Sequence, residues 1–179
     1  DTNFVITNHR TQVINVSDVS PEYCYRADGA ITITVSGDTD YFEYSWLPAE
    51  VNVNADMVSN LKAGTYTVTV YDGTCTVSKD IEVPFVEGPK ADFVTKTYNV
   101  PTNSTFALSD NTQPGGGTLS VWNWTLGDGT SESGQIIYHS YDAIGDYYVF
   151  FHVIDENACF DTITKKIHVY DELSVYIPN

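Results

Sequence analysis

Positive charge is scarce in this sequence. Its 179 residues include 8 Lys and Arg against 24 Asp and Glu, which gives a formal net charge of −16 at pH 7. Phosphate backbones and anionic lipid surfaces are bound by clustered cations. We therefore expect no nucleic-acid partner. Acidic character spread along the chain is typical of a soluble surface that does not associate with itself.

Long apolar runs and helical periodicity are also missing. The longest nearly apolar run, YYVFFHVI (Tyr147–Ile154), has 8 residues, whereas a membrane-spanning helix needs about 20. There are only 6 Leu and 1 Met, but 21 Thr, 20 Val and 13 Tyr. Branched and aromatic side chains suit a pleated, half-buried surface. The composition predicts an all-β fold.

Two segments of the chain repeat one strand pattern. AGTYTVTVYDGTC (Ala63–Cys75) and IGDYYVFFHVIDENAC (Ile144–Cys159) each contain Gly, Tyr two residues later, and branched or aromatic residues at alternate positions. Alternation with period 2 is what a sheet with one buried face requires. The two copies predict two similar β-sandwich domains in tandem.

The predicted boundary lies at PFVEGPK (84–90), because its two prolines and glycine interrupt strand pairing. The expected organisation is a lead-in (1–10), a first sandwich (11–86), a second sandwich (87–171) and the start of a further domain (172–179). In each sandwich an aromatic-rich strand precedes the repeated one, YFEYSW (41–46) and VWNWTL (121–126). Further strands are expected at 12–16, 31–35, 75–83, 91–97, 105–109 and 159–169.

The three cysteines bear on stability, because domains of this size have marginal cores. A Cys24–Cys75 disulfide would close a loop of about 50 residues and contribute roughly 4 kcal/mol on the chain-entropy model. The alternative is a pair of reduced core thiols. Cys159 is expected to be a buried free thiol, and three cysteines with one left over do not form a zinc site.

Residues that carry out catalysis are not arranged in any recognisable motif. The sequence contains no H-E-x-x-H, no G-x-S-x-G and no phosphate-binding loop. We expect no catalytic residues and no enzymatic activity.

Calcium is the one cofactor for which the sequence offers candidate ligands. Asp38 and Asp40 have D-x-D spacing, and Asp155 begins a short acidic turn. Calcium requires six to eight oxygens, and neither stretch has the complete loop motif. Ordinary strand-connecting turns are the alternative and better-supported interpretation.

The run VWNWTLGDGT (Val121–Thr130) places an aspartate between two glycines, directly after an aromatic strand. Such a carboxylate could bind a metal or act as an acid. We instead interpret Gly127, Asp128 and Gly129 as the tight turn that ends the strand, with Asp128 bonding turn backbone.

Two aromatic residues alternate with the core positions of their strand. Tyr148 and Phe150 should therefore point away from the core. One interpretation is contact with a surface ligand such as a glycan. The other is packing beneath a loop or a neighbouring strand, which is favoured because scattered surface aromatics are common.

The second sandwich resembles the PKD domain, an immunoglobulin-like sandwich of secreted and surface proteins. The resemblance rests on WTLGDGT (Trp124–Thr130), HSY (His139–Tyr141) and GDYYVFFHVID (Gly145–Asp155), with Leu126 where the family usually has Phe. It implies an immunoglobulin-like fold for the second sandwich. Because the strand pattern is repeated, we expect two tandem immunoglobulin-like β-sandwich domains.

The first sandwich resembles the SprB-type repeat of Bacteroidota surface adhesins. The matching features are Cys24, DGAITITVSG (Asp28–Gly37), Tyr44, Trp46 and NLKAGTYTVTVYDGTC (Asn60–Cys75); DTDY replaces a Gly/Pro-rich stretch after VSG. The last residues, Tyr176, Ile177, Pro178 and Asn179, resemble the opening of the sorting domain of type IX secretion cargo.

Together these resemblances imply the membrane-proximal stalk of a gliding-motility adhesin, held on the outer face of the outer membrane. The implied partners are neighbouring repeats of the same chain, a PorP/SprF-type outer-membrane protein that contacts the C-terminal region, and a surface polysaccharide as candidate ligand. The alternative is a pair of accessory domains, glycan-binding or spacer, of a secreted hydrolase. Upstream catalytic sequence or upstream repeats would distinguish the two.

Overall fold

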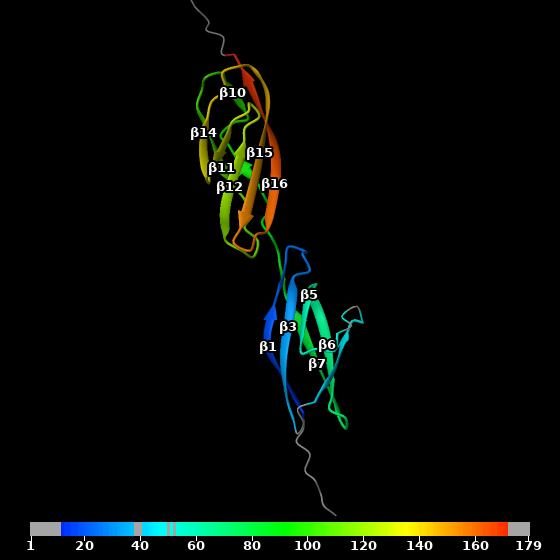
Figure 1. The fold of residues 1–179 in the computed structure, drawn as a ribbon. Helices are drawn as coiled ribbons and strands as arrows, with labels where there is room; N and C mark the ends of the chain where they lie inside the picture. The colour runs from blue at the N-terminus through cyan, green and yellow to red at the C-terminus, as the bar shows by residue number, and fades with distance from the viewer. Residues whose placement is uncertain (1–11, 38–40, 50, 52, 172–179) are drawn as a thin grey trace, which may run out of the picture. The chain divides into compact units, whose positions relative to one another are not determined.

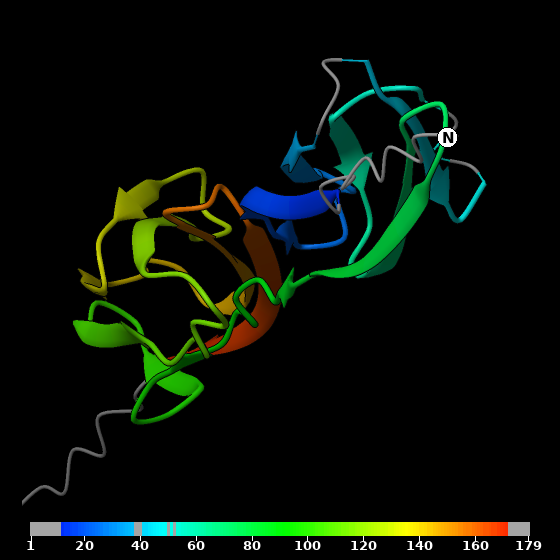
Figure 2. The same ribbon diagram turned by 90° about the horizontal axis from the view of Figure 1, so that it is seen from below.

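A computed structural model describes residues 12–37, 41–49, 51 and 53–171, and every regular element in these residues is a β-strand. The chain divides between Val86 and Glu87 into two compact units, unit 1 and unit 2. Figures 1 and 2 show two views of the ribbon. The predicted lead-in (1–10) and the start of the sorting domain (172–179) lie outside the described residues.

Unit 1 is built from two three-stranded sheets and a short strand pair. The first sheet has the order β1-β3-β5 and the second β4-β6-β7, all with antiparallel neighbours. The strands are β1 (Val13–Ser20), β3 (Gly29–Ser36), β5 (Met57–Leu61), β4 (Glu43–Leu47), β6 (Gly64–Tyr71) and β7 (Thr76–Val83). A parallel pair, β2 (Glu22–Tyr23) and β8 (Phe85–Val86), lies where the unit ends.

The repeated strand of unit 1 is β6, and its alternation is confirmed. Tyr66, Val68 and Val70 are all buried, with Val68 and Val70 fully inaccessible. They pack against Ile31 and Ile33 of β3 in one core cluster. Apolar positions at every second residue therefore face a core between the two sheets.

Unit 2 is a sandwich of a five-stranded and a three-stranded sheet. The larger sheet has the order β10-β16-β15-β12-β13, and the smaller β14-β11-β9. The strands are β10 (Asn99–Pro101), β16 (Phe160–Tyr170), β15 (Gly145–Asp155), β12 (Leu119–Thr125), β13 (Ser131–Ser133), β14 (Ile136–His139), β11 (Phe106–Asp110) and β9 (Phe93–Val94).

Aromatic stacking marks the centre of the core of unit 2. The rings of Trp124 and Phe151 are stacked with centroids 4.0 Å apart, and Phe93 meets Trp124 edge to face at 5.2 Å. All three side chains are buried. Val149 and Val153 are fully buried on the same face of β15, which confirms the second repeated strand; Tyr147 is half-buried against this core.

Some predicted strands differ from those observed. The strand expected at 91–97 is reduced to β9 at Phe93–Val94, because the chain then leaves β11 and joins the other sheet as β10. The short strands β2, β8, β10 and β13 and the edge strands β5 and β14 were not predicted. Strands of two or three residues are too short to show a period.

Candidate functional site

The Gly127–Gly129 turn is held by the side chain of Asp128. Its Oδ1 accepts hydrogen bonds from the backbone N–H of Thr130 at 2.9 Å and from the Thr130 hydroxyl at 2.6 Å. The backbone N–H of Leu126 donates to the Thr130 carbonyl at 3.0 Å, which closes the turn. One carboxylate oxygen is therefore committed to local backbone, as the turn interpretation predicts.

The second oxygen of Asp128 contacts the HSY motif. Oδ2 lies 2.9 Å from Nε2 of His139 on β14. Two residues further on, the buried Tyr141 hydroxyl donates to the Leu126 carbonyl at 2.6 Å. The two sequence motifs thus bind each other, and Asp128 joins a turn of the larger sheet to a strand of the smaller one.

Protonation of Asp128 is opposed by these contacts. Partial burial raises the pKa of this carboxyl, but the Thr130 hydrogen bonds and His139 outweigh that effect and hold the pKa below its usual value. Burial, together with the nearby Asp128 charge, raises the pKa of Tyr141 well above its ordinary range. An acid catalyst needs a carboxyl that is protonated near neutral pH, so Asp128 does not have that property.

The backbone conformation at position 127 and its distance from β15 both require a glycine. Its φ is +84°, a left-handed conformation that side chains disfavour. A Cβ at this position would also lie 2.9 Å from the backbone nitrogen of Tyr148. The glycine lets the turn approach β15 closely.

The side chain of Asp155, one of the three calcium candidates, also accepts hydrogen bonds from the backbone of a turn. It is buried, and its Oδ1 accepts the backbone N–H groups of Asn157 at 2.9 Å and Cys159 at 2.8 Å. Asp38 and Asp40 lie outside the described residues. Within the described ranges, no group of three or more His, Cys, Asp or Glu is placed to hold a metal ion. A calcium site therefore stays a prediction.

The cysteines require a correction. Cys75 is free and exposed, so the predicted Cys24–Cys75 disulfide is wrong. Cys75 lies beside the beginning of β1, where the Gln12 side chain donates to its backbone carbonyl. Cys24 lies beyond the end of β1, where its N–H donates to the Val86 carbonyl. The eight residues of β1 separate those points by about 26 Å, far beyond disulfide reach. Cys24 and Cys159 are each disulfide-bonded, so the expectation of a free Cys159 is also wrong.

The outer face of the larger sheet of unit 2 carries exposed aromatic residues. Tyr148 is 61% exposed and Phe150 41%, the outward orientation predicted for them. Phe160 on β16, 67% exposed, lies beside His152 with ring centroids 5.4 Å apart. Sequence reasoning missed Phe160, although the alternation of β16 could have placed it on this face. We call Tyr148, Phe150, His152 and Phe160 the aromatic face.

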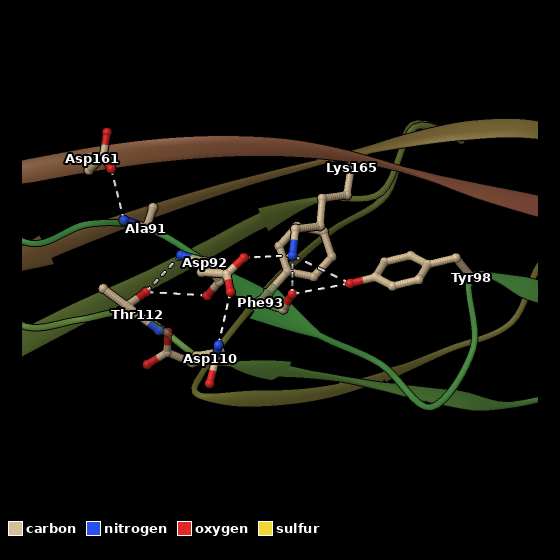
Figure 3. A network of polar contacts seen from close by, with 9 residues as sticks. Ala91, Asp92, Phe93, Tyr98, Asp110, Thr112, Asp161 and Lys165 are labelled. Carbon is tan, nitrogen blue, oxygen red and sulfur yellow. Dashed lines mark hydrogen bonds and ion pairs between the residues drawn. The ribbon is translucent and has the colours of Figure 1, made fainter.

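A polar network surrounds the beginning of unit 2 (Figure 3). Lys165 on β16 reaches Asp92 at 2.6 Å and donates to the Phe93 carbonyl at 2.6 Å. Asn111 donates to the other oxygen of Asp92 at 2.9 Å. Hydrogen bonds from Lys165 and Asn111 hold the pKa of Asp92 below its usual value. These groups satisfy one another and connect the first and last strands.

Three surface grooves could receive a ligand; one of them, of 420 Å³, is lined by His168 and Asp171 at the end of β16. The other two have no such groups among the residues that the structure describes. One, of 730 Å³, is lined in unit 1 by Pro48, Val51, Val53 and Leu61; the other, of 440 Å³, lies in unit 2 between Val94 and Phe106. Among the described residues that line them there is no carboxylate, histidine or cysteine. Neither of these grooves therefore presents a carboxylate or histidine that could act as a general acid or base. No described helix is long and apolar enough to cross a membrane.

The fold, together with turns held by their own aspartate side chains, defines a class of protein: tandem all-β sandwiches of immunoglobulin-like type. Within that class, residues 86–169 match the family described as PKD domain. A PKD domain is therefore present in unit 2. Such domains are typically accessory, non-catalytic modules of extracellular or surface proteins. Among proteins of curated function, no sequence matches this chain.

Several solved structures are similar to the chain. A carbohydrate-binding module of the β-sandwich superfamily is 25% identical, with a TM-score of 0.45; the match covers 47% of this chain and 35% of that one. The PKD1 domain of Vibrio anguillarum Epp is 24% identical, with a TM-score of 0.44, covering 49% and 99%. Three N-terminal domains of the bacteriophage RB49 outer capsid protein Hoc are 15% identical, with a TM-score of 0.57, covering 89% and 59%.

Proposed function

We propose that this chain is a non-enzymatic segment of a cell-surface adhesin, a stalk built from consecutive β-sandwich units. The observation that carries the proposal is that each unit has its own hydrophobic core. In unit 2, the polar side chains of the sequence motifs bond to groups of the same unit. Asp128, Tyr141 and Asp155 each make at least one hydrogen bond to a backbone group of their own unit. A module of this kind supplies length and rigidity.

The finer form of the proposal is a gliding-motility adhesin exported by type IX secretion and held outside the outer membrane. It is supported by the resemblance of unit 1 to SprB-type repeats and of Tyr176–Asn179 to a sorting-domain start. In this proposal, residues beyond Asn179 bind a PorP/SprF-type protein, and neighbouring repeats of the same chain contact the stalk.

A pull-down from detergent-solubilised outer membranes tests this finer form. A chain extended past Asn179 should recover a PorP/SprF-type protein, and residues 1–179 alone should not. Equal recovery with both would show that the sandwiches themselves are the docking surface. Recovery with neither would remove the outer-membrane attachment from the proposal.

A second candidate function is supported by the aromatic face. Exposed aromatic rings on the outer face of a sheet can stack on the apolar faces of sugar rings, so the unit could serve as a glycan-binding accessory domain of a secreted hydrolase. A glycan array probed with the wild-type chain, the Tyr148→Ala, Phe150→Ala double variant and a Tyr138→Ala control tests it. Tyr138 is 69% exposed on the smaller sheet. Binding lost only in the double variant supports the glycan function, and no binding by the wild type contradicts it.

A further inference from the structure

Strand β9 ends before the neighbouring strand β11 does. β9 pairs with Ser109 and Asp110 of β11, whereas β14, on the other side of β11, pairs with Phe106–Ser109. After Val94 the chain leaves this sheet and joins the larger one as β10. On the β9 side, the part of β11 from Phe106 to Leu108 therefore has no neighbouring strand among the described residues.

The segment that crosses between the two sheets is bonded to β16. The His168 N–H donates to the Tyr98 carbonyl at 2.8 Å, and Lys165 Nζ donates to the Phe93 carbonyl at 2.6 Å. The Tyr98 hydroxyl donates to the same Phe93 carbonyl at 3.3 Å. Figure 3 shows the chain between Phe93 and Tyr98. These bonds hold the crossing segment on the side of β16, so it does not continue beside β11.

Backbone groups of alternate residues along β11 point to the β9 side. The Asn111 N–H donates to the Asp92 carbonyl there at 2.9 Å, whereas the Asp110 N–H donates to the Gln135 carbonyl on the β14 side. By this alternation, the N–H and C=O of Ala107 also point to the β9 side. Within the part of the chain that the structure describes, no strand pairs with Ala107 there. An extended chain in this position would meet one free donor and one free acceptor.

The 440 Å³ groove of unit 2 lies at this free edge. It is bounded by Ala107 and Phe106 of β11, by Val94 at the end of β9, and by Val100 and Pro101 of β10. A strand added to β11 would lie about 4.8 Å from it, on the side where the groove is open. Its side chains would alternate between solvent and the apolar wall of the groove.

The groove also carries a cation without a carboxylate partner. Lys96 is the one charged residue among the described residues that line it. Of the four lysines of unit 2, Lys90, Lys165 and Lys166 each contact a carboxylate. No ion pair is present for Lys96 within the described ranges. In a chain with 24 Asp and Glu, this cation is available to an acidic group of a ligand.

We propose that this groove is a docking site for an extended peptide segment of a partner protein, which adds to the free edge of β11 as a strand. The peptide places a branched apolar side chain against Val100 and Phe106 and a carboxylate beside Lys96. A peptide fits better than a sugar, because a strand edge recognises the backbone N–H and C=O of an extended chain. The proposal goes beyond the proposed function, since it concerns unit 2 alone and holds for a stalk or for an accessory domain.

Amide hydrogen exchange of the full chain, followed by NMR, tests the strand addition. The probe is the synthetic peptide acetyl-Glu-Val-Thr-Val-Glu-amide. At saturation, the Ala107 amide should exchange at least about tenfold more slowly, because it gains a hydrogen bond. Leu108, whose N–H points to β14, is the internal control and should not change. Binding without protection of Ala107, or no binding at about 1 mM peptide, would overturn the proposal. Protection of Ala107 by cellohexaose and not by the peptide would contradict it in favour of a sugar site.

A charge reversal then tests the role of Lys96. Lys96→Glu should weaken binding of the acidic peptide about three- to tenfold, as the loss of an exposed ion pair and a new repulsion do. The same variant should strengthen binding of a peptide with Lys in place of both Glu residues. Lys166→Glu is the matched control, because Lys166 bonds Asp146 on the larger sheet and does not line the groove. Equal weakening by the two variants would show a general effect of net charge and contradict the site.

Discussion

Asp128 and His139 lie 2.9 Å apart, carboxylate to imidazole, and join the turn after β12 to the end of β14. Tyr141 strengthens the same junction from the core through its bond to Leu126. The stretch of sequence that most resembled an active site thus consists of residues that bind one another. Their conformity to a family motif reflects the geometry of a turn between two sheets.

Replacing Asp128 should destabilise unit 2. Asp128→Ala removes two bonds to Thr130 and one to His139, and we expect a loss of about 1–2 kcal/mol in the free energy of unfolding. Urea unfolding followed by tryptophan fluorescence in a Trp46→Phe background reports unit 2 alone. Asp142→Ala, an exposed carboxylate near the same junction, is the control. A loss no larger than in that control would show that the turn does not depend on Asp128.

Acid should weaken unit 2 through its bonded carboxylates. The pKa values of Asp128 and Asp92 lie below their usual range in the folded protein. Because the folded pKa is the lower one, these groups stabilise the fold above their unfolded pKa of about 4 and lose that contribution as the pH falls further. The free energy of unfolding should therefore decline from about pH 4 toward pH 2. Asp128→Asn should make the decline shallower, and an unchanged slope would exclude Asp128 as a contributor.

The hydroxyl of Tyr141 should matter more than that of an exposed tyrosine. Tyr141→Phe leaves the Leu126 carbonyl without its 2.6 Å donor in a buried environment, at an expected cost of about 1–3 kcal/mol. Tyr138→Phe, with a ring 69% exposed, should change stability by less than about 0.5 kcal/mol. Equal effects from the two substitutions would indicate that the Tyr141 bond contributes no more than a surface hydroxyl.

Cys75 should be the one thiol that reacts in the folded chain. It is exposed and free, whereas Cys24 and Cys159 are disulfide-bonded. Titration of the non-reduced protein with a thiol reagent should give one equivalent, and Cys75→Ser should give none. Labelling of Cys24 or Cys159 without reductant would contradict the assignment.

Alternation made the strands of the core predictable. Val68 and Val70 in unit 1, and Val149 and Val153 in unit 2, are buried at the positions that period 2 assigns. The role of Asp128 as a turn residue followed from its neighbours, because glycine on both sides indicates backbone that a side chain must stabilise.

Contacts between distant residues were not predictable in the same way. Lys165 and Asp92 are separated by 73 positions, and no local pattern indicates that β16 passes beside the first strand. The cysteine error has the same origin, since separation in sequence did not reveal that Cys24 and Cys75 flank opposite ends of β1. Chain topology determines both relationships.

The most direct test of a surface stalk is the location of these units on the cell that makes them. Antibodies raised against residues 12–171 should label intact cells, and external protease should remove that label without lysing them. The culture fluid should hold no catalytic protein that carries the same units. Label recovered mainly from the fluid, on a chain that degrades polysaccharide or protein, would contradict the adhesin and favour an accessory domain of a secreted hydrolase.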